Sequence, residues 1–442
     1  MPAILTQPLL ERTVLDNGLR VVIAPDHAAP VVAVAVVYDV GFRSEPEGRT
    51  GFAHLFEHLM FQGSANVAKM EHGRLVQGAG GAFNGHTRPD LTSYYEAIPA
   101  NALELALFLE SDRMAALQLD QENLDNQIAV VEEEIRVNVL NRPYGGFPWI
   151  DLPGLAFDTF ANSHNGYGSF EDLDHATLED AESFYRDYYA PANAVLVLAG
   201  DLEVASTFEL VERYFGGIQS RPAPKRPDFS EPPITSLRHR SRFDQHAPTP
   251  AAAIGFRAPD PVKELGATLA SAVLAATLGD GDASRLRRRL VYEERTVTDL
   301  SCYLGTFSDP LSMRDPLLFQ VVLFHSGKRS AEQLTQDVLN ELASLERDGP
   351  EDSELGRVTS KLIAERWHEA DRLLERALGI ADVTVIHDRP DLYFEIPAQL
   401  SKVDAEQVKT AARRLLSQMP CVVEILPSDS QVVSDRNVGV GS

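Results

Sequence analysis

The sequence predicts an α+β protein of two similar halves, each a mainly antiparallel sheet packed with helices. Three observations carry this prediction. Apolar, β-branched runs alternate with segments of helical periodicity along the 442 residues. Residues 220–236 contain five prolines in seventeen positions, which is typical of a linker. The order of helices and strands after this linker repeats, in outline, the order before it. We therefore expect a first half at residues 1–219, a linker at 220–236 and a second half at residues 237–442.

The first half begins with strands. Short apolar runs flank Asp16-Asn17-Gly18, a hairpin signal. Residues 31–41 form a continuous β-branched run of the kind found in buried strands. A helix is expected at 51–62, where no proline interrupts the apolar pattern, and residues 80–99 favour a hairpin of strands. The remaining predicted elements are helices at 70–80, 100–117, 120–141, 177–189 and 204–215, and a buried strand at 191–202.

The second half repeats this plan with different residues. An apolar helix is expected at 265–279, where the first half has the helix at 51–62. A single helix is expected over 352–379, because the helical pattern continues without proline. The chain then ends on a helix and a strand, in the order that closes the first half. Two further strands, at 251–259 and 317–325, and a helix at 330–349 complete the prediction.

Composition and charge limit the possible partners and compartments. The net charge of −25 argues against a nucleic acid or an anionic membrane surface as a partner. The two cysteines, Cys302 and Cys421, lie far apart and predict neither a disulfide framework nor a cysteine-based zinc site. The N-terminus lacks the pattern of a signal peptide, and no window reaches about 18 apolar residues, the length of a membrane span. The expected compartment is the cytoplasm.

Residues 54–58 read His-Leu-Phe-Glu-His, an H-x-x-E-H pattern within the predicted helix at 51–62. Positions four apart lie on one face of a helix, so His54 and His58 project side by side, with Glu57 on the same side. Two imidazoles and a carboxylate on a shared face suit a hydrolytic zinc site. The alternative, two histidines of a surface or a satisfied core, fits less well with the apolar residues around them. Glu57 would be the general base, because its place beside His58 makes it a poor additional ligand.

A hydrolytic zinc site usually has a third protein ligand. The best candidates are Glu132, Glu133 and Glu134 in the predicted helix at 120–141. Glu134 sits at the edge of the apolar stripe and could face inward, whereas the other two look more solvent-facing. Periodicity alone does not separate the three.

The chain resembles the inverzincin zinc metallopeptidases, the superfamily of pitrilysin, insulin-degrading enzyme and mitochondrial processing peptidase, and within it the short-chain processing-peptidase branch. The similarity covers most of the chain. The segments that carry it are DNGLRVV, GFAHLFEHLMFQGS, GGAFNGHT, TSYYEAIP and YYAPANAVLVLAGD. The resemblance implies Zn²⁺ as cofactor, His54, His58 and Glu134 as its ligands, and Glu57 as the base. Many relatives have a glutamate seven residues before the third ligand, where this chain has Gln127.

The resemblance also implies how a peptide binds. An edge strand near GGAFNGHT would accept the substrate backbone by β-augmentation, with Phe83, Asn84 and Gly85 as the binding residues. A plain hairpin is the alternative for this segment. Relatives complete in one chain, or the partner subunit, also carry an Arg and a Tyr seven residues apart, in a run similar to SRLxxxLRxxxGLAY. Here these positions are expected to hold Tyr292 and Asp299.

The expected function is therefore zinc-dependent endopeptidase, acting on peptides or unfolded segments. Because the Arg/Tyr pair is expected to be absent, a second subunit of the same fold would supply it, with a homodimer as the less favoured arrangement. The alternative is a non-catalytic subunit of the same fold, with a regulatory or core-type assembly role. The intact H-x-x-E-H pattern and Glu134 argue against that alternative.

Overall fold

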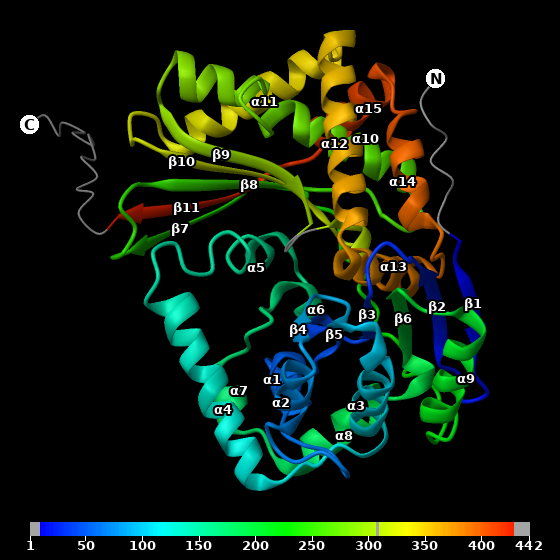
Figure 1. Cartoon of the computed structure of the whole chain (residues 1–442). Coiled ribbons are helices and arrows are strands. Elements are labelled where there is room, and N and C mark those ends of the chain that lie inside the picture. Colours follow the sequence, from blue (N-terminus) through cyan, green and yellow to red (C-terminus); the bar gives the residue numbers. More distant parts are fainter. Residues whose placement is uncertain (1–8, 306–308, 428–442) are drawn as a thin grey trace, which may run out of the picture.

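The computed structural model describes residues 9–305 and 309–427 and contains two sheets, one above the other, with helices packed on them (Figure 1). The first sheet has the strand order β1-β2-β6-β3-β5-β4. All its neighbours are antiparallel except β2 and β6, which are parallel. Its strands are β1 (Glu11–Val14), β2 (Arg20–Pro25), β3 (Val31–Tyr38), β4 (Ala82–Thr87), β5 (Thr92–Pro99) and β6 (Ala194–Gly200).

The second sheet repeats this arrangement without a counterpart of β1. Its order is β7-β11-β8-β10-β9, and its one parallel pair, β7 with β11, matches the pair β2 with β6. The α+β architecture of two similar, mainly antiparallel units is confirmed. The strands are β7 (Arg238–Asp244), β8 (Ala251–Arg257), β9 (Val297–Leu304), β10 (Leu318–His325) and β11 (Cys421–Pro427).

Helices cover one face of the first sheet and form its main core. Apolar residues of α1, α3, α8 and α9 pack there against alternate residues of β3 and β6. The start of α8 is fixed by a capping box, in which Thr177 and Asp180 bond to each other's backbone N–H. The helices are α1 (Phe52–Leu59), α2 (Glu71–Gly78), α3 (Leu103–Ala116), α4 (Gln121–Ile135), α5 (Pro153–Ala156), α6 (Phe160–Ser163), α7 (Phe170–Asp174), α8 (Leu178–Tyr188) and α9 (Val204–Phe215).

The second half contains six helices among the described residues. They are α10 (Leu265–Gly279), α11 (Ala331–Asp348), α12 (Asp352–Asp371), α13 (Leu373–His387), α14 (Leu392–Leu400) and α15 (Ala405–Leu416). The single helix expected over 352–379 is wrong: Arg372 has an extended backbone, and the chain turns there from α12 into α13. The turn lets α13 pack on the first sheet instead of continuing away from it.

Each sheet is covered on its second face by a segment from the other half. Helix α13 lies on the first sheet through Ala377, Ile380 and Ala381 (Figure 1). In return, the segment that contains α5 packs Phe147 and Leu152 on the second sheet. Residues 220–236 contain no helix or strand. The boundaries of the two halves nevertheless stay a prediction, because the packing crosses them.

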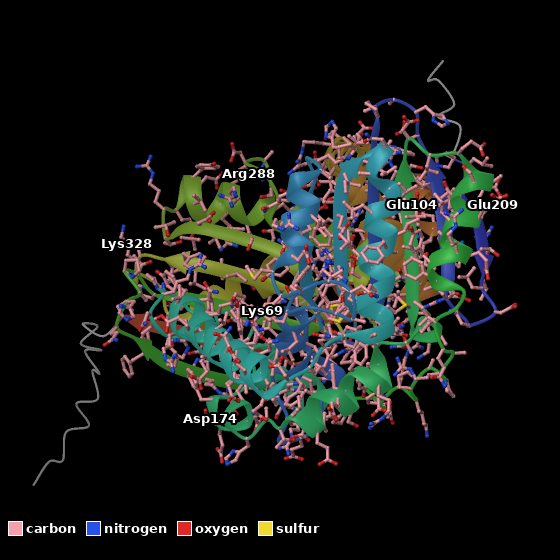
Figure 2. All side chains as sticks on the ribbon, turned by 60° about the horizontal axis from the view of Figure 1, so that its bottom comes forward. Lys69, Glu104, Asp174, Glu209, Arg288 and Lys328 are labelled. Atoms are coloured by element: carbon pink, nitrogen blue, oxygen red, sulfur yellow. The ribbon has the colours of Figure 1, made fainter. Side chains whose placement is uncertain are left out.

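The surface agrees with the acidic composition. Charged side chains such as Glu104 on α3 and Glu209 on α9 lie on the outside of the molecule (Figure 2). Of the helices in residues 9–305 and 309–427, none has the length and apolar character needed to cross a bilayer.

Candidate metal centre

Helix α1 holds the H-x-x-E-H residues on the face opposite its core contacts. Phe52, Leu55, Phe56 and Leu59 are buried in the main core. The helix begins at Gly51, whose φ of 88° is in the left-handed region and whose added Cβ would lie 2.6 Å from the carbonyl oxygen of Tyr167. The sequence places glycine there because the chain turns sharply against a neighbouring backbone.

The free N–H groups at the start of α1 are bound by a buried carboxylate. Glu45 accepts hydrogen bonds from the backbone N–H of Gly51 at 2.9 Å and of Ala53 at 2.7 Å. His164 contacts the same carboxylate at 3.1 Å. Burial lowers the pKa of His164, but the hydrogen bond to Glu45 opposes this effect and the pKa is raised overall. The position of α1 is therefore fixed from its first turn, and with it the direction of the two histidines.

The structure brings His54, His58 and Glu134 together. The Nε2 atoms of the two histidines lie 3.3 Å apart, and the Glu134 carboxylate oxygens lie 3.4 Å from Nε2 of His54 and 3.5 Å from Nε2 of His58. Ligands about 2.0–2.2 Å from a tetrahedral zinc are separated by about 3.3–3.6 Å. The two imidazole nitrogens, and the carboxylate oxygen nearest to each of them, are thus separated by distances typical of zinc ligands.

The protonation states also suit a metal. Burial lowers the pKa of His58, which favours the neutral imidazole. The hydrogen bond from His54 lowers the pKa of Glu134, which favours the carboxylate. Metal ligands must be in these deprotonated forms. The donor set therefore fits a zinc ion in both spacing and charge.

Periodicity left three glutamates of α4 open, and the structure separates them. Glu134 faces α1, as above. Glu132 and Glu133 instead form ion pairs with Arg136, at 3.0 Å and 3.4 Å. Only Glu134 of the three is in reach of the histidines.

Glu57 lies beside the three ligands, in contact with β4. The hydroxyl of Thr87 donates to its carboxylate at 2.9 Å. Burial raises the pKa of Glu57 above its usual value, although His54 opposes this shift. A Cβ added to Gly85 would lie 3.1 Å from Cγ of Glu57. Glu57 is therefore a carboxylate of raised pKa held in place by β4, as a general base requires.

The predicted peptide-binding residues have different surroundings. Gly85 lies against Glu57, Asn84 is exposed, and the ring of Phe83 packs on Phe61 at 5.3 Å and under α2. Strand β4 is the edge of its sheet and pairs with β5 alone among the described strands. Its free edge offers backbone groups to a peptide. Peptide binding by these three residues stays a prediction.

Two residues near the metal ligands were missed from the sequence. The ring of Tyr167 lies edge-on to that of His54, with centroids 5.0 Å apart, and Asn138 donates to the Tyr167 hydroxyl at 3.3 Å. Asn138 belongs to a π-helical turn, Arg136–Leu140, that follows α4. Such turns are frequent at functional sites, but the sequence carries no sign of one here.

Gln127 lies seven residues before Glu134 on α4 and is buried. Its side chain accepts a hydrogen bond from His58, which raises the pKa of the imidazole against the larger effect of burial. A histidine that ligates through Nε2 is commonly oriented in this way through its other nitrogen. The neutral amide of Gln127 can thus orient the imidazole of His58.

The expected positions of the missing Arg/Tyr pair need a correction, because the pattern counted from Ser284 places its glycine at Arg295. Arg295 has a φ of 53°, in the left-handed region that favours glycine, and so stands at the glycine of the SRLxxxLRxxxGLAY pattern. Counting from there puts Val291 at the arginine position and Thr298 at the tyrosine position, instead of Tyr292 and Asp299. Neither register contains the pair, so its absence is unchanged.

Comparisons with known proteins find peptidase family models and proteases among the relatives. The family model described as insulinase, peptidase family M16, matches residues 20–143, and the model described as the peptidase M16 inactive domain matches residues 175–362. The chain is 27% identical to the zinc protease PqqE of Helicobacter pylori, over 79% of this chain and 78% of that protein. It is 22% identical to the mitochondrial-processing peptidase subunit beta of Blastocladiella emersonii, over 99% and 94%.

Solved structures show the same fold. The crystal structure of a protease from Helicobacter pylori has a TM-score of 0.88 and 24% identity, covering 96% of this chain and all of that one. A structure described as the peptidase M16 inactive domain from Pseudomonas fluorescens has a TM-score of 0.81 and 17% identity, covering 95% and 98%.

Proposed function

We propose that this chain, which belongs to the inverzincin superfamily of metallopeptidases, is a zinc-dependent endopeptidase. The observation that carries the proposal is the triangle of His54, His58 and Glu134, with Glu57 beside it. The names of the curated relatives, several of them zinc proteases, support the same reading.

His54, His58 and Glu134 would hold the metal and leave one position for water. A zinc ion bound there would supply Lewis-acid chemistry, lowering the pKa of that water to about 7 and polarising the scissile carbonyl. Glu57 then takes the proton of the attacking water and passes it to the leaving amine. The hydroxyl of Thr87 keeps the carboxylate of Glu57 oriented while Glu57 gains and loses the proton.

The substrate is a peptide or an unfolded segment, bound through its backbone. The free edge of β4 would pair with it, next to Gly85 and thus next to Glu57. Backbone pairing requires an extended chain and discriminates little between side chains, which suits unfolded segments. The proposed compartment is the cytoplasm, on the sequence prediction alone.

The proposed catalytic unit is a heterodimer with a second subunit of the same fold. The second subunit would supply the Arg/Tyr pair, because Val291 and Thr298 of this chain offer no guanidinium or phenol to a substrate carbonyl. A homodimer is less favoured because both copies would lack the pair. The chain assayed alone should be weakly active, and addition of a candidate partner should restore cleavage. Full activity of the chain alone would contradict this part of the proposal.

The alternative is a non-catalytic subunit of this fold, for regulation or assembly. Zinc content separates the two. Protein purified without chelator should contain one zinc per chain by metal mass spectrometry, and Glu134→Gln should lose it. Glu133→Gln is the matched control: it changes a neighbouring carboxylate that is exposed and paired with Arg136, and it should keep the metal. Less than stoichiometric zinc in the unmodified protein would favour the alternative.

Glu57→Gln tests the base. The variant should retain zinc and lose about 10²–10⁴-fold of the cleavage rate of the assembled enzyme, the usual contribution of a general base. Glu133→Gln again serves as the control and should cleave normally. Cleavage that survives in Glu57→Gln would show that another group takes the proton.

A further inference from the structure

The second half has a counterpart of the metal centre. Helix α10 packs against β9, α12 and α15 as α1 packs against β4, α4 and α8. In both halves the helix follows the central strand, β8 or β3, and precedes the edge strand, β9 or β4 (Figure 1). The two sheets therefore present their helices in the same way, and positions in one half can be matched to positions in the other.

The matching places three alanines at the positions of the metal-site residues. Ala272, Ala275 and Ala276 have the i, i+3, i+4 spacing of His54, Glu57 and His58. The buried residues between the first and second of these positions also match, since Val273 and Leu274 correspond to Leu55 and Phe56. The edge strand agrees: Cys302 pairs with Val321 on β10 as Gly85 pairs with Tyr94 on β5.

These alanines border a cavity of about 470 Å³. Ala272, Ala275 and Ala276 form one wall with Leu269, and Leu362 and Ile396 contribute from α12 and α14. The volume falls in the range of pockets that bind small molecules or single side chains. Where the first half gathers metal ligands, the second half thus has an apolar cavity wall.

Part of the cavity lining is polar and incompletely hydrogen-bonded. Asp382 on α13 is 4% exposed and lines the cavity. Its Oδ2 accepts from the hydroxyl of Ser312 at 2.7 Å and from Arg88 at 3.3 Å. Its Oδ1 is buried and has no hydrogen-bond partner among the described residues, and the same holds for the hydroxyl of Tyr393. A buried carboxylate oxygen without a partner is costly, so a donor from a ligand would satisfy it.

We propose that this cavity binds an ammonium or guanidinium group on an apolar stem, with the cation at Asp382 and the stem along the alanines of α10. The source is either a free amine or the lysine or arginine side chain of a bound polypeptide.

The charge of the lining supports a cation. Five carboxylates and two guanidinium groups face the cavity. One guanidinium, that of Arg366, is already bound to Asp309 and lies 3.1 Å from Glu369. Lys361, from outside the lining, neutralises Asp280 at 2.5 Å. Negative charge therefore remains in excess, and a cation is favoured over an anion or a neutral polar group.

The cavity also lies next to the edge strand of the first half. Arg88, which contacts Asp382, directly follows the last residue of β4. A polypeptide paired with β4 would therefore pass close to the cavity and could place a basic side chain in it. This geometry makes a polypeptide side chain a possible source beside a free amine.

Calorimetric titration of the full chain with hexylammonium tests the binding. The Glu57→Gln variant is used as the host, so that peptides are not cleaved and the result does not depend on catalysis or on zinc. We expect saturable binding that hexanoate and hexanol do not reproduce. Asp382→Asn, which keeps the shape, and Ala276→Leu, which fills the cavity, should each weaken it by about tenfold or more. Glu104→Gln, an exposed carboxylate on α3 (Figure 2), is the control and should bind normally.

A second titration separates the two sources. An unstructured peptide with one lysine is compared with the same peptide carrying norleucine. Tighter binding of the lysine peptide, abolished by Asp382→Asn, assigns the cavity to a polypeptide side chain. Equal binding of both peptides, together with saturable hexylammonium binding, assigns it to free amines. No saturable hexylammonium binding, or binding that both cavity variants leave unchanged, overturns the proposal.

Discussion

Glu96 on β5 is a buried carboxylate whose charge should cost stability. It is fully buried, and its Oε1 lies 2.7 Å from Nε2 of His72. Arg113, the nearest cation, is bound to Glu110 instead. Burial raises the pKa of Glu96 to about 7 and lowers that of His72 to about 3. The folded protein therefore keeps the proton on the carboxyl and leaves the imidazole neutral.

The magnitude follows from the shift in Glu96. Its pKa is raised from 4.5 to about 7, so its contribution to stability is full below about pH 4.5 and is lost as the pH rises through 7. Each pKa unit corresponds to about 1.36 kcal/mol, so ionisation costs the folded state up to about 3 kcal/mol. Glu96→Gln keeps the shape and cannot ionise. The variant should gain up to about 3 kcal/mol over the parent protein between pH 4.5 and pH 8.

Urea denaturation of both proteins across this pH range measures the effect. His72 acts in the opposite direction, since its lowered pKa stabilises the fold above about pH 6.5 and that stability is lost toward pH 3. It is present in both proteins, so it largely cancels in the difference. Glu110→Gln is a contrasting variant: it leaves the guanidinium of Arg113 buried without its partner and should destabilise by about 3–5 kcal/mol at neutral pH. A Glu96→Gln difference that is constant or falls with pH would refute the reasoning.

Substitutions at three further residues test single features of the structure. Gln127→Ala should weaken zinc binding about 10–100-fold in a chelator competition assay, because the ring of His58 is freed, and Gln127→Glu should restore the affinity. Equal zinc affinity of the parent protein and both variants would exclude an orienting role for Gln127. Thr87→Val should lower kcat about tenfold with zinc content and KM unchanged, because Glu57 loses the hydrogen bond from the Thr87 hydroxyl. A change in KM alone would contradict a role of Thr87 in orienting the base. Arg295→Gly should raise the free energy of unfolding by about 1 kcal/mol by relieving the left-handed backbone, with Arg295→Asn between the two; a loss of stability would show that the arginine side chain is needed.

The parts of the site that depend on local periodicity could be predicted from the sequence. His54, Glu57 and His58 share a face because they belong to one helix. Glu134 lies on another element, and periodicity left it open beside Glu132 and Glu133. The structure selects it because its carboxylate lies within 3.5 Å of both histidines, whereas the other two glutamates pair with Arg136. Tyr167 reaches His54 from a loop, and no local pattern indicates that contact.

Elements that depend on distant packing were mispredicted. The helical pattern runs through Arg372 without a break, yet the helix ends there because α13 must lie on the first sheet. Strand β7 was not predicted, since Arg238, Arg240 and Arg242 make it polar rather than apolar. It forms because β11 offers a parallel partner at the edge of the second sheet. Both outcomes depend on residues more than a hundred positions away in the chain.

The proline-rich segment marks a boundary in the sequence that the apolar packing does not respect. Ala33, Ala35 and Val197 of the first sheet are buried under α13, which comes from beyond residue 236. Ala251 and Val423 of the second sheet are buried under the segment of Phe147, which comes from before residue 219. Removing either half would expose an apolar sheet face of the other to water, at about 25 cal/mol for each Å² uncovered. The duplicated halves therefore stabilise one another, and the polar contact of Arg88 with Asp382 lies where they meet.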